Sequence, residues 1–180
     1  MKTLLEIFAE ILGQQIGKGT EHTIYTSDKN PNAIVKVGKK ENVEKWSKVF
    51  KANPDLFPKV FKVGKLEDGQ YYAVIEKLDT KKAVEEWGKL EIALEDIGEV
   101  DTDVFESTID QVFIDIILGK KDANQIYKKL SGDNQKLFKK WIEFLAKTAK
   151  YLIDTKFGGL DIHRYNFAYD KKGKIKAIDI

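Results

Sequence analysis

The sequence contains no cysteine and only two histidines. Disulfide bonds and thiolate metal sites are therefore excluded, and a histidine-rich zinc site is not expected. Arginine is almost absent as well, because Arg164 is the single arginine among 31 basic residues. Arginine is the preferred bidentate reader of phosphate and guanine, and the net charge is only +2. We therefore expect no nucleic-acid partner.

Long apolar runs are also missing, since none approaches the ~18 residues that a membrane-spanning helix needs. Glu6 and Glu10 interrupt the apolar pattern of the N-terminal segment, so we expect no signal peptide, no membrane partner and a cytoplasmic protein. The composition, 42% hydrophobic and 33% charged over 180 residues, is that of a globular protein. Such a length suffices for one good core or two small lobes.

The first half of the chain predicts a small antiparallel sheet of four or more strands, preceded by a helix over residues 2–13. The pattern favours strands around Ile24 and over 33–37, 60–65 and 71–76. A further helix over about 41–51 is expected after the second of these strands. Its apolar face is formed by Val43, Trp46, Val49 and Phe50.

Two features of this sheet suggest that it binds an anion. Gly17 and Gly19 bracket one residue ahead of the first strand, and glycine lets backbone N–H groups approach an anion, although most such pairs are simply tight turns. Lys36 is more informative, because an unpaired lysine in a buried strand is costly and needs an anionic partner. Glu44 borders the apolar face of the helix and is the favoured partner, with Glu41 as the competitor.

The second half of the chain is dominated by helical periodicity, and residues 81–157 contain no proline. We expect helices over about 81–97, 102–118, 122–130 and 133–156. The boundary between two lobes therefore falls near 78–80. One apolar stripe, which we expect to be core rather than an interface, is formed by Val104, Phe105, Ile109, Val112, Phe113 and Ile116.

The last segment carries three polar side chains that could hold a metal-bound phosphate. Asp161 and Asn166 are five residues apart, and Asp179 follows Asn166 by thirteen. Between Asn166 and Asp179 the pattern predicts a hairpin whose turn, at 170–173, is supplied by Gly173. Such a hairpin carries Asn166 and Asp179 to neighbouring places at one end.

Taken in order, these features resemble the protein kinase-like superfamily. The segment Asp-Ile-His-Arg-Tyr-Asn at 161–166 is similar to the Asp-Leu-His-x-x-Asn motif of aminoglycoside and choline kinases. The resemblance implies an α+β fold in one kinase-like domain over 1–180. Its N-lobe, 1–79, would hold a small antiparallel sheet with one helix, and its reduced, mainly helical C-lobe, 80–180, would hold the catalytic loop and the metal-binding hairpin.

The resemblance also implies an ATP-dependent phosphotransferase, a kinase, with ATP and Mg²⁺ as cofactors. Asp161 would be the catalytic base, and Asn166 and Asp179 the metal ligands. Lys36, paired with Glu44, would bind the phosphates. The residues implied to contact the nucleotide are Gly17, Lys18, Gly19, Thr20, Ile24, Ile34, Lys36, Glu76 and Leu78.

The chain departs from the family pattern at three places. His22 replaces the third glycine of the loop, and we expect its side chain to face solvent rather than phosphate. Gly159 stands two residues before Asp161, where the family usually has histidine. Asp179 is followed by Ile180 and not by Phe-Gly, so we expect no peptide-binding platform after the metal ligand.

Without that platform, we expect the acceptor, a hydroxyl on a protein or a small molecule, to be recognised by residues 81–157 or by a partner protein that completes the C-lobe. The alternative is a nucleotide-binding pseudokinase or regulatory module that acts through a protein partner. A kinase reduced in this way would suit a bacterial virus or mobile element and act in the host cytoplasm.

Overall fold

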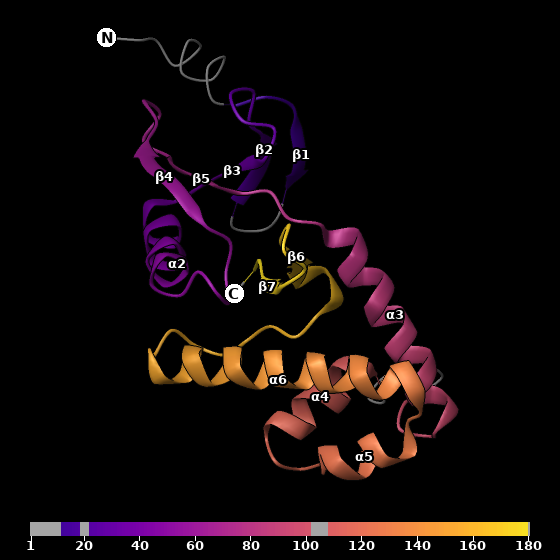
Figure 1. Cartoon of the computed structure of the whole chain (residues 1–180). Coiled ribbons are helices and arrows are strands. Elements are labelled where there is room, and N and C mark those ends of the chain that lie inside the picture. Colours follow the sequence, from indigo (N-terminus) through magenta and orange to yellow (C-terminus); the bar gives the residue numbers. More distant parts are fainter. Residues whose placement is uncertain (1–11, 19–21, 102–107, 180) are drawn as a thin grey trace. The chain divides into compact units, whose positions relative to one another are not determined.

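A computed structural model describes residues 12–18, 22–101 and 108–179. The chain divides into two compact units, Met1–Leu78 and Asp79–Ile180, and each is described by itself (Figure 1). The helix expected over 2–13 lies outside the described residues, except for Leu12 and Gly13, which are not helical. In the described part of the chain, no helix is both long and apolar enough to cross a membrane.

The first unit contains a five-stranded antiparallel sheet, which confirms the expected α+β class and the expected sheet. Its strands are β1 (Gln15–Lys18), β2 (His22–Thr26), β3 (Ala33–Gly38), β4 (Val60–Lys65) and β5 (Tyr71–Glu76). Their order in the sheet is β1-β2-β3-β5-β4, so β3 lies at the centre. On one face of the sheet, Val35, Val37 and Tyr72 pack with Leu12 and Leu66 into a core cluster.

Helix α2 (Lys40–Ala52) joins β3 to β4 and contacts β3, β4 and β5 (Figure 1). It forms because apolar residues recur three and four positions apart, which places them on one helical face. As expected, that buried face consists of Val43, Trp46, Val49 and Phe50, joined by Ser47. The Phe50 ring stacks on Phe57 at 5.1 Å and lies 5.2 Å from Trp46. An aromatic column therefore fixes the helix in this unit.

Substitution of two glycines by alanine is expected to change the stability in opposite directions. A Cβ at Gly64, in β4, would lie 2.6 Å from the Tyr72 ring of β5. We expect Gly64→Ala to lower the free energy of unfolding by about 1–3 kcal/mol, because the ring or the strand must shift. At Gly88, inside a helix of the second unit, a Cβ would meet no atom within 4 Å. Gly88→Ala should raise the free energy of unfolding by about 1 kcal/mol. Denaturant titrations measure both, and shifts of the same sign would contradict the packing.

The second unit contains four α-helices in the described residues: α3 (Thr80–Asp96), α4 (Ile109–Ile117), α5 (Ala123–Lys129) and α6 (Gly132–Asp154). Helix α6 contacts the other three (Figure 1). The bounds of α3, α5 and α6 agree with the expected ranges to within two residues. Of the range expected over 102–118, residues 109–117 are helical and 102–107 lie outside the described residues.

A side-chain cap begins α3, and a glycine ends α4. Asp79 accepts a hydrogen bond from Lys82 N at 3.2 Å and so caps α3. Gly119 ends α4, since its φ of +72° is a left-handed conformation that suits glycine. Within α4, Ile109, Val112 and Phe113 are buried, which confirms that this part of the apolar stripe is core. Val104 and Phe105 lie outside the described residues.

The core of the second unit is an aromatic cluster. Trp87 of α3 lies 5.0 Å from Trp141 of α6 and 5.0 Å from Phe113 of α4. Both tryptophan rings also contact Phe167, at 5.5 and 5.4 Å. Phe167 directly follows Asn166 in the chain, so this core fixes the backbone next to Asn166.

The expected hairpin is present. Strands β6 (Phe167–Tyr169) and β7 (Ile175–Ala177) pair antiparallel, with Phe167 opposite Ala177. Gly173, at φ +76°, permits the turn, as expected. Asp170 completes it by accepting hydrogen bonds from the backbone N–H groups of Lys172 and Lys174 at 2.9 and 2.8 Å.

Candidate functional site

Asp161 and Asn166 lie in contact in the second unit. The Asn166 Nδ2 group donates to Asp161 Oδ2 at 2.8 Å and to the Asp161 carbonyl oxygen at 3.2 Å. The intervening residues are drawn into a tight loop that ends in the 3-10 turn Arg164–Asn166. Asn166 therefore orients the carboxylate of Asp161.

The hairpin brings Asp179 to the end of β6 and β7 at which Asn166 lies. Ile178 N donates to the Asn166 carbonyl oxygen at 2.8 Å, which extends the pairing of β6 and β7 by one step. Asp179 is the next residue along the chain, so it follows directly after the residue that pairs with Asn166. The two predicted metal ligands are thus neighbours in the backbone register, as the spacing of thirteen residues predicts.

The polar groups of this cluster fit a hard divalent cation. Both N–H groups of the Asn166 amide point at Asp161, and among the described residues no hydrogen bond occupies its Oδ1. An amide oxygen and a carboxylate are ligands that Mg²⁺ prefers, with phosphate oxygens and water completing the octahedron. Nowhere in the described ranges, this cluster included, do three histidine, aspartate or glutamate side chains gather closely enough to hold a metal ion, so the amide of Asn166 is needed as a ligand here.

Glu86 anchors the hairpin from α3. Its Oε2 atom accepts hydrogen bonds from Lys140 Nζ at 2.6 Å and from Trp141 Nε1 at 3.2 Å, and also from the Tyr169 hydroxyl. Tyr169 further exchanges two backbone hydrogen bonds of 2.9 Å with Asp79. The Glu86 carboxylate therefore links α3, α6 and β6. Its contact on β6, Tyr169, lies three residues after Asn166.

The charge of Glu86 is stabilised by these contacts. Burial alone would raise the pKa of Glu86, but the hydrogen bonds from Lys140, Tyr169 and Trp141 and the charge of Lys140 outweigh it, so the pKa lies below its ordinary value. Burial and the Glu86 carboxylate raise the pKa of the Tyr169 hydroxyl, which stays a donor. No sequence signal marked Glu86, because an isolated glutamate on a helix is usually a solvated charge.

Asp110 of α4 is a second carboxylate that the sequence did not indicate. Burial and the Glu91 charge raise its pKa, against the opposing effects of His163, a Trp87 hydrogen bond and Arg164. It therefore interacts with the two residues of the loop between Asp161 and Asn166 that can carry positive charge. The side chains of His163 and Arg164 also pack on Tyr165, at 5.2 and 5.1 Å.

Lys36 lies at the centre of the sheet in the first unit and is 4% exposed. It is opposite Ile24 of β2 and Ala73 of β5, and directly opposed residues share a face of an antiparallel sheet. Ile34 is two residues away on the same strand and shares that face. Gly17 is opposite Ile24. The unit therefore gathers four of the predicted nucleotide-contacting residues around β2 and β3.

An aromatic ring from α2 lies close to this lysine. Lys36 Nζ lies 5.5 Å from the ring centroid of Trp46. Glu44 and Glu41, the expected partners, are exposed, so their role toward Lys36 stays a prediction. His22 was expected to face solvent, but its ring is half-buried and lies 6.4 Å from that of Trp46. That expectation was wrong, because the pleat of β2 turns the ring toward α2.

The remaining predicted contacts lie at the ends of strands. Lys18 is exposed at the end of β1, and Gly19 and Thr20 lie outside the described residues. Glu76 N donates to the Lys59 carbonyl oxygen at 2.9 Å, and Glu76 Oε2 accepts from Lys59 N at 3.2 Å. Across the described residues, no hydrogen bond uses the backbone N–H of Leu78. That N–H remains able to bind a ligand.

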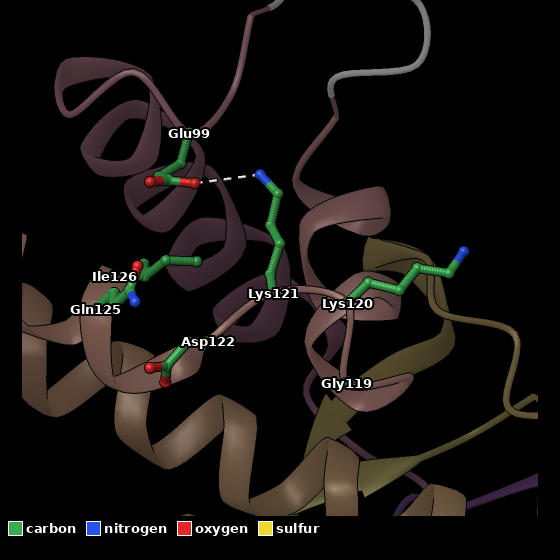
Figure 2. Close-up of a pocket in the computed structure, with 7 residues that line it drawn as sticks. All are labelled: Glu99, Gly119, Lys120, Lys121, Asp122, Gln125 and Ile126. Carbon is green, nitrogen blue, oxygen red and sulfur yellow. Dashed lines mark hydrogen bonds and ion pairs between the residues drawn. The ribbon is translucent and has the colours of Figure 1, made fainter.

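A separate cavity of about 430 Å³ lies in the second unit and shares no residue with this cluster (Figure 2). Its lining residues are Glu99, Gly119, Lys120, Lys121, Asp122, Gln125 and Ile126. Figure 2 shows Lys121 directed at Glu99, whose carboxylate it meets at 3.1 Å. Lys129 binds the same carboxylate at 2.5 Å. Glu99 therefore pairs with two lysines at this cavity.

No model of a protein family matches the chain, and no curated protein has a significantly similar sequence.

Proposed function

We propose that the protein is an ATP-dependent phosphotransferase that moves the γ-phosphoryl group of Mg-ATP to a hydroxyl acceptor. The observation that carries the proposal is the double hydrogen bond from Asn166 to Asp161, with Asp179 adjacent to Asn166 in the hairpin register. Phosphoryl transfer needs charge neutralisation and alignment more than covalent chemistry. An oriented carboxylate beside two oxygen ligands meets that need.

The first unit supports the same proposal. Its described residues form the antiparallel sheet and one helix, as the resemblance implies for a kinase-like N-lobe. A lysine buried in the central strand supplies the positive charge expected for contact with phosphates. The Leu78 N–H, which makes no hydrogen bond within the described residues, suits the hydrogen-bonding edge of an adenine.

In the proposed reaction, Asp161 accepts the proton of the acceptor hydroxyl as the hydroxyl oxygen attacks the γ-phosphorus. The bond between the γ-phosphorus and the bridging oxygen of the β-phosphate breaks, and ADP leaves. Asn166 holds the Asp161 carboxylate in place through Nδ2 and offers Oδ1 to the metal, as Asp179 offers its carboxylate. Mg²⁺ bound there would neutralise charge on the phosphates.

One observation favours a second candidate, a nucleotide-binding pseudokinase that acts through a protein partner. Glu44, which the resemblance pairs with Lys36, is exposed on α2. If Glu44 stays in solvent and does not pair with Lys36, a kinase-like protein can bind a nucleotide without aligning it for transfer.

Thermal unfolding with and without Mg-ATP tests the nucleotide proposal. A ligand at 100 times its Kd stabilises the folded state by about 2.7 kcal/mol, so we expect a clear rise in melting temperature. No rise would overturn both candidates. Incubation with γ-labelled ATP and a panel of protein and small-molecule acceptors then separates them, because the pseudokinase would bind ATP and label nothing.

The Asp179→Ala variant tests the metal ligand. We expect this variant to lower the apparent Mg²⁺ affinity, measured through ATP binding, by at least about tenfold. Loss of a group that only supports a metal ligand already costs about 10–100-fold in metal affinity. ATP binding in the presence of EDTA should be unchanged and serves as the control. Calorimetric titration at several Mg²⁺ concentrations measures both, and an unaltered Mg²⁺ dependence would remove Asp179 from the metal site.

A further inference from the structure

We propose that Trp46 is a positioning residue for Lys36, and that its ring face holds the ammonium group ready for the phosphates of ATP. The inference rests on the proposed function and names how this protein orients the lysine. Trp46 is one of three tryptophans in the chain and the only one in the first unit.

The distance and burial of the pair support a cation–π contact. Lys36 Nζ lies 5.5 Å from the Trp46 ring centroid, within the roughly 6 Å over which a ring face attracts a cation. Lys36 is 4% exposed and Trp46 is 5% exposed. Such contacts are strongest when both partners are removed from water, and tryptophan is the best ring for them.

The Trp46 ring is itself held in place. Val43 and Phe50 lie on the same buried face of α2, and the Phe50 ring packs 5.2 Å from Trp46. Phe50 in turn stacks on Phe57 at an interplanar angle of 5°. On another side, the His22 ring lies 6.4 Å away. A ring fixed by this column can fix the lysine that lies over it.

The unsatisfied indole N–H of Trp46 indicates that residue 46 does more than fill the core. Trp46 Nε1 is buried and, among the described residues, has no hydrogen-bond partner. A buried unsatisfied donor costs stability, and phenylalanine would fill a core position without that cost. Tryptophan attracts the Lys36 ammonium more strongly than phenylalanine would, and this attraction offsets the cost of the unsatisfied N–H.

Fluorination of Trp46 tests the contact, because each fluorine withdraws charge from the ring face and changes its size little. Tryptophan with one, two or three fluorine atoms is placed at residue 46 alone. We expect the Kd for Mg-ATP to rise stepwise, by about fivefold over the series, while the Kd for adenosine, which has no phosphate, stays constant. Adenosine binding is the internal control, because a change in packing around Trp46 alone would alter both Kd values.

A double substitution isolates the pair. In a Lys36→Met background, fluorination at residue 46 should no longer affect the Kd for Mg-ATP. If the unsubstituted protein binds Mg-ATP and the series at residue 46 is flat, or adenosine binding weakens in parallel, the positioning role is overturned and the proposed function stands. If the unsubstituted protein binds no Mg-ATP, the proposed function fails and this inference fails with it.

Discussion

Replacement of Asp161 by alanine is expected to slow phosphoryl transfer by roughly 10²–10⁴-fold, the range typical for loss of a general base. The affinity for Mg-ATP and the melting temperature should change little. Asp161 is exposed, and the hydrogen bond from Asn166 to the carbonyl oxygen of residue 161, 3.2 Å long, does not need the carboxylate. Transfer from γ-labelled ATP, measured beside ATP titration and thermal unfolding, separates catalysis from binding and folding.

A matched control is Asp154→Ala, which removes an exposed carboxylate at the end of α6 in the same unit. We expect this variant to transfer phosphate at the unaltered rate. If Asp161→Ala also transfers at that rate, Asp161 is not the base. A loss of ATP binding or of melting temperature in Asp161→Ala would instead give the residue a structural role.

Replacement of Glu86 by alanine is expected to lower the free energy of unfolding by about 3 kcal/mol. The side chain of Glu86 is 15% exposed, and its loss leaves Trp141 Nε1 and the Tyr169 hydroxyl without their acceptor. Both donors belong to buried residues. Because Tyr169 lies on β6, we also expect weaker Mg²⁺ dependence of ATP binding in this variant.

Glu85→Ala is the matched control, since Glu85 is the neighbouring carboxylate on α3. Its side chain is 58% exposed and pairs with the exposed Lys81 at 3.9 Å. Exposed pairs of this kind contribute about 0.3–0.5 kcal/mol. Denaturant unfolding compares the two variants, and equal losses would show that the hairpin does not depend on Glu86.

The stabilisation from Glu86 is expected to disappear in acid. The pKa of Glu86 is lowered in the folded state from its ordinary value of 4.5. The carboxylate therefore contributes fully above pH 4.5, and its contribution is lost as the pH falls through the lower folded pKa. Glu99 has a lowered pKa as well, so the difference between wild type and Glu86→Gln isolates the Glu86 contribution. That difference should be largest at neutral pH and shrink below pH 4.5.

The local features of the fold could be predicted from the sequence because short-range chemistry determines them. Gly173 and Asp170 form a turn with their immediate neighbours, and the spacing of Asn166 and Asp179 follows from the pairing of the two arms. The buried face of α2 could also be predicted, since helical periodicity alone selects Val43 and Trp46.

The contacts between distant segments could not be predicted in the same way. Glu86 looks like an ordinary helix charge until α6 and β6 bring three donors to it. For Lys36, the sequence favoured Glu44 because opposite charges attract. The contact of Lys36 with Trp46, on the buried face of the same helix, was not predicted, and the pairing with Glu44 stays a prediction. A buried lysine beside a helix with an inward tryptophan is the signal that could have indicated the contact.

The hydrogen bond between Glu86 and Tyr169 joins residues 83 positions apart. Contacts this distant form only after the entropy of closing a long loop has been lost, so we expect the hairpin to dock late in folding. Interactions that are absent from the transition state alter the rate of unfolding rather than the rate of folding. The lifetime of the arrangement of Asn166 and Asp179 therefore depends on a glutamate that has no part in the proposed transfer.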